Sequence, residues 1–529
     1  MPRPRPHLRR AAAVALVVLT AAIAWSVAGG AVRDALHLPP LVFVSRAPLA
    51  GAPGAVPGLG PNQRDAVTGG RLMLRAADGT LRELAPGLLR DASDPSVSPD
   101  GRRVLFSGVR AGRDEGWRLF LWDLAADRLD TTLATADVPP FDPCWISDSA
   151  AVVVGVMPGA IGQYREAPVT QLWVIRIPRP ATAPVRITAE RNGAEEPAWD
   201  ATTGRIVYAR WWYNRWRPTD DPGAHGVTFE PAHALGDSVN LWQIVSVRPD
   251  GSGARVEASG LSNRLTSMGT QPVVLADGSI VATYGSNLGL SPAPGALGLQ
   301  RFAPRIGGAR RIIGALVETG PTYGTPHGLA APAACAAAAL PDGRIVFSYD
   351  PGARGDFGLY VMRRDGSHVE KVVDLPGTLE LDAAPVIARR GPWARLATSA
   401  APSAAATFRF FDRDVFGGGH ARPGVHAAPP RTAGARIRFW TTVARAGGAA
   451  GDSAVLLREV PVRSDGSVDE TLPADLAMFE QLVDAQGRVL RSAEGPAHVA
   501  GFNSGRAGAT AACIGCHTGH STIAVPAPR

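Results

Sequence analysis

Residues 94–107 read DPSVSPDGRRVLFS, and this stretch decides the fold. A short run over residues 94–97 leads into the turn Pro99-Asp100-Gly101, and a run rich in β-branched and aromatic residues leaves it. Proline presets the backbone angle that such a turn requires, and glycine adopts the positive φ that other residues resist. The stretch therefore predicts two short β-strands joined by a tight turn.

The same pattern recurs along the chain. Weaker copies are DPCW at 142–145, EPAW at 196–199, QPVV at 271–274, and AP at 331–332 followed by LPDGRIVF at 340–347. A second strand pair follows each copy, marked by LFLW at 119–122, QLWV at 171–174, NLWQ at 240–243 and GLYV at 358–361. Four short strands that repeat at intervals of roughly 50 residues are the signature of a β-propeller. We predict an all-β chain with a propeller over residues 37–390.

An incomplete copy near the end of the repeats and unpaired strands near the N-terminus predict the number of blades. A sixth copy begins at residues 382–388 (DAAPVIA), but no partner strands follow it. The N-terminal region supplies them, with a second strand at 41–45, a third at 71–74 and a fourth at 80–84. A blade built from both ends of the chain closes the ring and leaves no open sheet edge. The sequence predicts six blades, with seven as the alternative.

These copies resemble the PD40 (TolB-type) propeller repeat, whose common feature is the Pro-Asp-Gly turn. The resemblance implies the architecture and hardly anything about function. Residues 211–237 interrupt the third copy, and an insertion this long is either a functional surface loop or a spacer. Its aromatic residues and arginines, beginning with Trp211 and Trp212, would suit a docking surface. His225 and His233, with nearby acidic residues, would suit a metal.

After the propeller the composition changes twice. Residues 391–430 are rich in Ala, Ser, Pro and Gly and are predicted to be a linker. Alternation of apolar and polar residues then resumes, with turns at Asp465-Gly466 and Gln486-Gly487. Segments of period two with such turns predict a small antiparallel β-sandwich over residues 431–503, followed by a C-terminal tail over 504–529.

The tail contains the main candidate for a functional site, the motif CIGCH at residues 513–517. C-x-x-C-H is typical of c-type haem attachment, in which Cys513 and Cys516 bond to the haem vinyl groups and His517 is an axial ligand of the iron. A redox dithiol of the thioredoxin type would open a helix of a βαβ unit, which is not expected here. A structural zinc needs four ligands, whereas Cys144 and Cys335 lie far upstream. The motif predicts one covalent haem c.

The surroundings of the haem are also constrained by the sequence. Because only residues 518–529 follow the motif, the haem is expected to be covered by the sandwich, by the propeller or by another protein. His498, about one strand upstream, is the best local candidate for the sixth iron ligand. An open or water-bound iron is the alternative, and Met478 is expected to be a core residue.

The N-terminus predicts export. Four arginines precede an uncharged run over residues 11–32, which as a helix would be about 33 Å long and so would cross a hydrocarbon core. We predict an N-terminal anchor over residues 1–36, with a cleaved signal peptide as the alternative. The arginines should remain cytoplasmic, which places the bulk of the chain on the periplasmic side of the bacterial inner membrane.

The net charge of +7 arises almost wholly from arginine, because Lys371 is the only lysine. The arginines are spread along the chain, whereas a nucleic-acid footprint would cluster on one face. No nucleic-acid partner is therefore predicted.

Several C-terminal segments are similar to the hydrazine synthase alpha-subunit middle-domain family. They are DGSV at 465–468, LPAD at 472–475, FEQLVD at 479–484, GRVL at 487–490 and CIGCH at 513–517. The resemblance implies a propeller of this repeat type, followed by a β-domain with a covalent haem on Cys513, Cys516 and His517. The enzyme that names the family carries more than one haem in one chain, whereas this sequence has one motif, so hydrazine formation is not implied.

Three functions are compatible with these features. The first is a monohaem c-type protein that exchanges electrons with a redox partner docked on the propeller. The second is a haem-dependent oxidoreductase subunit that acts on a small inorganic nitrogen compound, as the resemblance suggests. The third is a propeller scaffold in which the haem is structural. The sequence leaves open whether the protein is an enzyme.

Overall fold

The computed structural model describes the chain between residues 36 and 516, with gaps. The described ranges are 36–52, 55–61, 63–113, 115–130, 139–162, 167–177, 183–214, 216–218, 229–231, 239–259, 268–285, 297–302, 309–314, 332–394, 406–417, 428–443, 453–491 and 502–516. Every regular element of these ranges between Leu41 and Cys513 is a β-strand. The predicted all-β class is confirmed.

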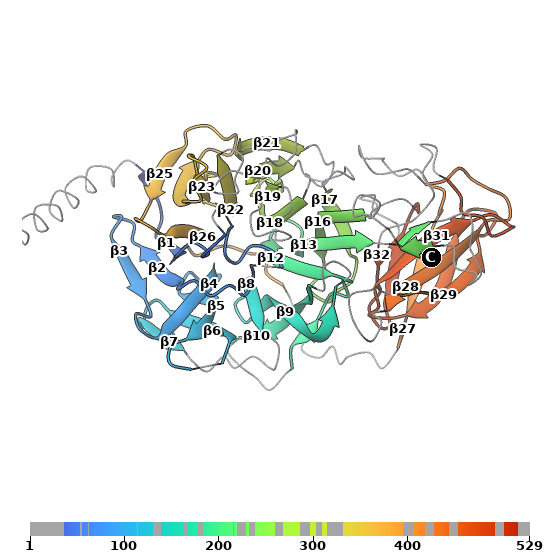
Figure 1. The fold of residues 1–529 in the computed structure, drawn as a ribbon, viewed down its shortest axis with the longest axis horizontal. Helices are drawn as coiled ribbons and strands as arrows, with labels where there is room; N and C mark the ends of the chain where they lie inside the picture. Colours follow the sequence, from blue (N-terminus) through green and yellow to red (C-terminus); the bar gives the residue numbers. More distant parts are fainter. Residues whose placement is uncertain are drawn as a thin grey trace, which may run out of the picture.

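Six four-stranded antiparallel sheets lie around a common centre (Figure 1). The first sheet contains, from the centre outward, β26 (Leu379–Pro385), β1 (Leu41–Arg46), β2 (Arg71–Arg75) and β3 (Leu81–Leu84). The second contains β4 (Leu89–Val97), β5 (Arg103–Arg110), β6 (Trp117–Asp123) and β7 (Arg128–Asp130). The third contains β8 (Pro140–Ser147), β9 (Ala150–Ile161), β10 (Pro168–Arg176) and β11 (Val185–Arg186).

The other three sheets follow the same order. The fourth contains β12 (Gly193–Asp200), β13 (Arg205–Asn214), β16 (Val239–Val247) and β17 (Arg255–Ser259). The fifth contains β18 (Met268–Val274), β19 (Ile280–Gly285), β20 (Leu297–Phe302) and β21 (Ala309–Gly314). The sixth contains β22 (Ala333–Ala339), β23 (Ile345–Asp350), β24 (Gly358–Met362) and β25 (Glu370–Val373). The inner strands contact one another in the order β26, β4, β8, β12, β18, β22 and back to β26.

Asp-Gly turns join several inner strands to their neighbours. Gly101 has a φ of 74°, and its N–H donates to the Ser98 carbonyl at 2.9 Å. The Asp100 side chain accepts a hydrogen bond from the Arg102 N–H at 3.1 Å. The same arrangement recurs at Asp277-Gly278 and Asp342-Gly343. Each turn is thus stabilised by hydrogen bonds among its own residues, so its position can be predicted from the local sequence.

Four of the marked copies have β-bulges inside their inner strands, at Asp94-Pro95, Asp142-Pro143, Glu196-Pro197 and Gln271-Pro272. The strand register breaks at each of them, as between Ser93 and Ser96 of β4. The first bulge residue has a positive φ in all six inner strands: Asp94 (54°), Asp142 (45°), Glu196 (54°), Gln271 (46°), Ala336 (49°) and Asp382 (55°). Such angles are uncommon outside glycine, so their recurrence marks one structural position repeated six times.

The bulges correct two details of the predicted repeat. The stretch that begins at Asp94 is the second half of a strand, because β4 already begins at Leu89. The fifth copy has its bulge at Ala336-Ala337 rather than at residues 331–332. This bulge has neither an acidic residue nor a proline, so the sequence pattern does not reveal its position in the fifth copy.

The first sheet is built from both ends of the propeller sequence, as predicted. β1 pairs with β2, where Leu41 lies opposite Arg75, and also with β26, where Leu41 lies opposite Pro385. All six residues of β1 are buried. β1 therefore covers one edge of β2 and one edge of β26, so neither edge is left unpaired.

The segment at 211–237 lies only partly within the described residues. β14 (Trp216–Pro218) pairs with β15 (Phe229–Pro231). Trp211 is buried and stacks on Trp242, with ring centroids 5.5 Å apart and planes 8° apart. Trp211 therefore belongs to the propeller core and not to a docking surface. The possible metal ligands His225 and His233 lie outside the described residues.

Residues 407–513 form a second unit of two facing sheets. One contains β30 (Val468–Pro473), β27 (Thr407–Asp412) and β33 (Thr510–Cys513). The other contains β29 (Ser453–Pro461), β28 (Arg436–Val443), β31 (Met478–Val483) and β32 (Phe502–Asn503). A shared apolar cluster fills the space between them, with Phe410 and Phe439 in edge-on contact at 4.9 Å. Met478 belongs to this core, as predicted.

The second unit differs from the prediction in three ways. The predicted linker at 391–430 contains β27, which is the central strand of its sheet. The unit is not purely antiparallel, because β27 and β33 run parallel. The C-x-x-C segment does not follow the sheets as a tail, since Cys513 is the last residue of β33. These pairings join residues about a hundred positions apart, for which the sequence holds no local signal.

The described residues contain no helix long and apolar enough to cross a membrane. The predicted anchor, with its apolar run over residues 11–32, lies outside the described part of the chain.

Candidate functional site

The C-x-x-C loop is held against the end of β27. β33 pairs with β27 so that Cys513 lies opposite Asp412. The Arg413 N–H then donates to the Cys513 carbonyl at 3.1 Å, and the Cys516 N–H donates to the Val415 carbonyl at 2.8 Å. The backbone of the loop is therefore fixed at both cysteines.

Gly515 makes the turn between the two cysteines. Its φ is 84°, a value that a side chain would strain. Its N–H donates to the Asp414 carbonyl at 2.9 Å. Gly417 faces the same loop, since a Cβ there would lie 3.1 Å from the Ile514 side chain. Two glycines thus allow the loop and residues 414–417 to pack closely.

The two thiols lie against the apolar core of the second unit. Cys516 is buried and Cys513 is half-buried, and both contact the cluster that contains Phe410 and Met478. All four cysteines of the chain are described, and none forms a disulfide. Burial, followed by nearby carboxylates, raises the pKa of both Cys513 and Cys516 well above the usual range. Both therefore remain thiols at neutral pH, unlike the reactive thiolate of a redox dithiol.

Two buried carboxylates face this cysteine pair. Asp412 and Glu480 stand in the inward rows of β27 and β31, at positions where the neighbours two residues away are Phe410, Met478 and Leu482. The Cys513 thiol donates to Asp412 Oδ2 at 3.4 Å. Sequence analysis missed both acids. An acidic residue in the inward row of an alternating strand was the signal that could have found them.

Asp412 is expected to make stability depend on pH. Burial raises its pKa to about 6, although hydrogen bonds from the Asp414 N–H and the Cys513 thiol oppose the change. An unfolded aspartate titrates near a pKa of about 3.9, so the folded state binds the proton more tightly. Asp412 thus contributes stability that is fully present below pH about 4 and is lost as the pH rises through about 6.

The substitution Asp412→Asn should remove this dependence. Relative to wild type, its free energy of unfolding should rise by about 1–3 kcal/mol between pH 4 and pH 7. Urea unfolding at a series of pH values measures the difference, with Glu370→Gln, an exposed acid of β25, as control. Parallel curves for Asp412→Asn and wild type would contradict the assignment.

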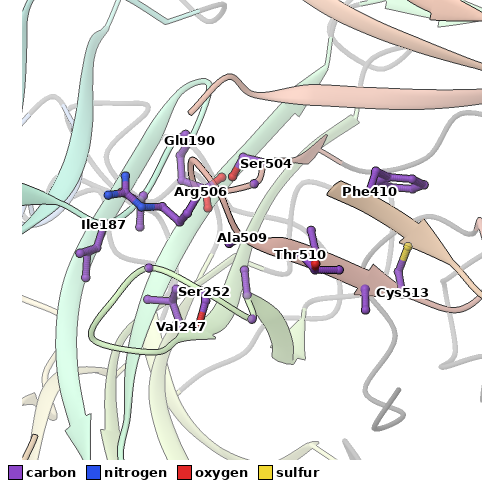
Figure 2. A pocket seen from close by; sticks show the side chains of 18 of the residues that line it. Ile187, Glu190, Val247, Ser252, Phe410, Ser504, Arg506, Ala509, Thr510 and Cys513 are labelled. Atoms are coloured by element: carbon purple, nitrogen blue, oxygen red, sulfur yellow. The ribbon is translucent and has the colours of Figure 1, made fainter. Parts of the chain in front are cut away.

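A cavity of about 60 Å³ separates the cysteine strand from the propeller. Figure 2 shows Cys513 and Thr510 of β33 on one side and Glu190, Ile187 and Val247 of the propeller on the other. The Tyr208 hydroxyl, which also lines the cavity, donates to Glu190 Oε1 at 2.7 Å. Burial raises the pKa of Tyr208 well above its usual range, so the phenol keeps its proton.

Direct contacts hold the two units together beside this cavity. Arg191 Nε donates to Thr442 Oγ1 at 2.6 Å, and Arg186 Nη2 donates to the Asp475 carbonyl at 3.4 Å. The propeller thus covers one side of the strand that carries Cys513. None of these contacts was predicted, because nothing in residues 186–210 marks them as facing a distant β-domain.

The remaining predicted site residues lie beyond the described part of the chain. These are His517, predicted to be an axial ligand, and His498, the candidate sixth ligand. Among the described residues, no group of three or more His, Cys, Asp or Glu side chains could hold a metal ion. The described donors fit a covalent haem better than a protein-chelated metal, because the two protonated thiols stand at C-x-x-C spacing beside an apolar core.

Comparison with solved structures gives a match over most of the chain. Hydrazine synthase of Kuenenia stuttgartiensis superposes with a TM-score of 0.66 at 15% identity, over 92% of this chain and 70% of that chain. The two share a fold. TolB of Acinetobacter baumannii matches with a TM-score of 0.40 at 12% identity, over 65% of this chain and 66% of that chain.

Sequence comparisons add nothing to this likeness. No family model matches the chain. No curated protein matches it either.

Proposed function

We propose that this protein is an exported c-type haem protein that exchanges electrons with a docked redox partner. Cys513 and Cys516 would hold one haem through thioethers, and His517 would bind its iron. The observation that carries the proposal is the pair of protonated thiols at C-x-x-C spacing, fixed by β27 and packed on an apolar core. A haem in this place supplies one-electron chemistry at its iron.

The architecture suits such a role. The six sheets are the blades of a six-bladed propeller that is closed by β1 and β26. The propeller covers one side of the cysteine strand, and the apolar core of the sandwich lies on the other, so both would limit access to a haem held there. An anchor over residues 1–36 holds the chain at the periplasmic side of the inner membrane.

A second function is favoured by the fold shared with hydrazine synthase. In this alternative the haem iron is open, and the protein acts as an oxidoreductase subunit on a small inorganic nitrogen compound. The buried carboxyl of Asp412 beside the cysteines would then be available to hold a proton near the haem, and Glu480 is buried close by.

Carbon monoxide distinguishes the two functions. We expect the reduced full-length protein to show the spectrum of a six-coordinate c-type haem that carbon monoxide does not change, because an electron-transfer haem needs no vacant position. Rapid formation of a carbon monoxide complex would contradict electron transfer and favour the oxidoreductase. Titration of the purified reduced protein, followed by visible absorption, measures the outcome.

A further inference from the structure

The six bulges place a set of side chains around the centre of the propeller, far from the cysteine strand. In ring order these are Asp382, Asp94, Asp142, Glu196, Gln271 and Ala336. Four neighbouring positions are acidic, and the other two carry an amide and a methyl group. The four carboxylates therefore form an arc along one side of the channel, which we call the acidic arc.

The acidic arc lines a cavity of about 410 Å³ on the propeller axis. All six inner strands contribute to its wall, and Trp199, Arg389 and Trp393 lie among its other lining residues. This volume suits a small molecule and greatly exceeds that of a single ion. The cavity also offers apolar wall around the carboxylates, including Val274 and Ala337.

The segment between β1 and β2 packs against the inner side of the ring. Its residues Val56 and Leu59 belong to a core cluster with Trp211 and Leu381 from two different sheets. Arg64 of this segment pairs with Glu195, and Arg46 of β1 pairs with Asp91. These two guanidinium groups are shared, because each pairs with another acid and also acts on carboxylates of the arc. Arg389 and Arg390 line the cavity as well, so the four carboxylates of the arc outnumber these two further cations.

One carboxylate oxygen of the arc, Asp142 Oδ1, lacks a hydrogen-bond donor within the described part of the chain. Asp142 is only 6% exposed, and its Oδ2 accepts the Glu196 N–H at 3.1 Å. Its Oδ1 meets no hydrogen-bond donor among the described atoms, while the Asp94 carboxyl is its neighbour. Two carboxyl groups that face each other in a buried place require either a shared proton or a cation between them.

The raised pKa values of the arc residues are consistent with a shared proton or a bound cation. Burial, followed by the neighbouring Asp94, holds the pKa of Asp142 well above its usual range, and burial followed by Asp142 does the same for Glu196. Burial, followed by Asp94, raises the pKa of Asp382 to about 7. In the absence of a cation, protons therefore occupy part of the arc at neutral pH.

We propose that the acidic arc binds a small organic cation that carries primary ammonium groups, of the polyamine class. An ammonium donates three hydrogen bonds and tolerates acceptors spread along an arc. A bare metal ion is less suitable, because no three acidic side chains of the described residues are placed to chelate one. The hydrocarbon part of the ligand would lie along the apolar wall of the cavity. This site does not depend on the haem.

Spermidine, putrescine and the uncharged analogue 1,4-butanediol are the probes, titrated calorimetrically into the full-length protein. We expect spermidine and putrescine to bind and the diol not to bind. Affinity should increase from pH 6 to pH 8, because the cation displaces protons from the arc. The titratable and charged groups that line the cavity are Asp94, Asp142, Cys144, Glu196, Asp382, Arg389 and Arg390. Cys335, Arg46 and Arg64 lie next to the arc and also influence this dependence.

Asp142→Asn and Glu196→Gln should each weaken spermidine at least about tenfold, the effect of losing one charge-assisted hydrogen bond. Both are isosteric and remove like-charge repulsion, so they should fold at least as well as wild type. Glu370→Gln on β25 is the matched control and should bind as wild type does.

Three results would overturn the proposal. They are failure of every amine to bind at pH 8, binding that Asp142→Asn leaves unchanged, and binding of Ca²⁺ or Mg²⁺ with no binding of amines. A lysine-containing peptide in place of spermidine distinguishes a protein ligand from a free amine. Stronger binding of the peptide than of spermidine would overturn the assignment to a small molecule.

Discussion

Replacing both cysteines of the motif, Cys513→Ala with Cys516→Ala, should abolish covalently bound haem. The wild-type protein, expressed together with a c-type maturation system, should carry one haem per chain that survives denaturing electrophoresis. The double variant should carry none, because each thioether needs one of these two thiols. Haem staining of the gel and the pyridine haemochrome spectrum of the purified protein measure the change.

The chain provides its own control for this experiment. Cys144 and Cys335 lie in β8 and β22 of the propeller, outside the C-x-x-C loop, and neither forms a disulfide. The pair Cys144→Ala with Cys335→Ala should retain the full haem content. A wild-type band without haem, or a stained band in the variant that lacks Cys513 and Cys516, would refute the haem assignment.

The single variants test the geometry of the loop. Cys513 is half-buried at the edge of a cavity, whereas Cys516 is buried in the apolar core. Each single substitution leaves one thiol, so a haem attached by one thioether is expected. Such a haem shifts the pyridine haemochrome band to longer wavelength than that of the wild type, because one vinyl group remains unsaturated.

The second large effect concerns closure of the propeller. Deleting β1, residues 41–46, should cause aggregation or loss of the cooperative unfolding transition. β1 lies between β26 and β2, and its removal exposes the edges of both strands. Thermal unfolding followed by circular dichroism, together with size-exclusion chromatography, measures the result. A soluble deletion variant with an unchanged transition would contradict closure through β1.

A single substitution tests the contribution of β1 without deleting the strand. Phe43 is fully buried in the cluster around Leu41 and Val346. Phe43→Ala should lower the free energy of unfolding by about 3–5 kcal/mol, the usual cost of removing a buried aromatic side chain. Leu88→Ala is the matched control, because Leu88 is 50% exposed and should change stability by less than about 0.5 kcal/mol. Equal effects of the two variants would contradict a structural role for β1.

The sequence by itself determined the features whose cause is local. A Pro-Asp-Gly turn is stabilised by its own aspartate and by the positive φ of its glycine, so the hairpins and their repetition could be read directly. The incomplete sixth copy and the spare N-terminal strands then required the pairing of β1 with β26. The C-x-x-C-H spacing is likewise a local pattern, because five consecutive residues contain all of it, and it indicates the candidate site without any tertiary contact.

Only the tertiary structure decided which distant residues share a site. Asp412 lies opposite Cys513 across a parallel pairing, and Tyr208 of the propeller lines the same cavity as that cysteine. Predicted as part of a linker, the strand that contains Asp412 proved central to the second unit. The acidic arc is equally invisible in the sequence, where its members look like the beginnings of strands. They converge because six equivalent bulges meet at one axis, and an axis exists only once the sheets have closed around it.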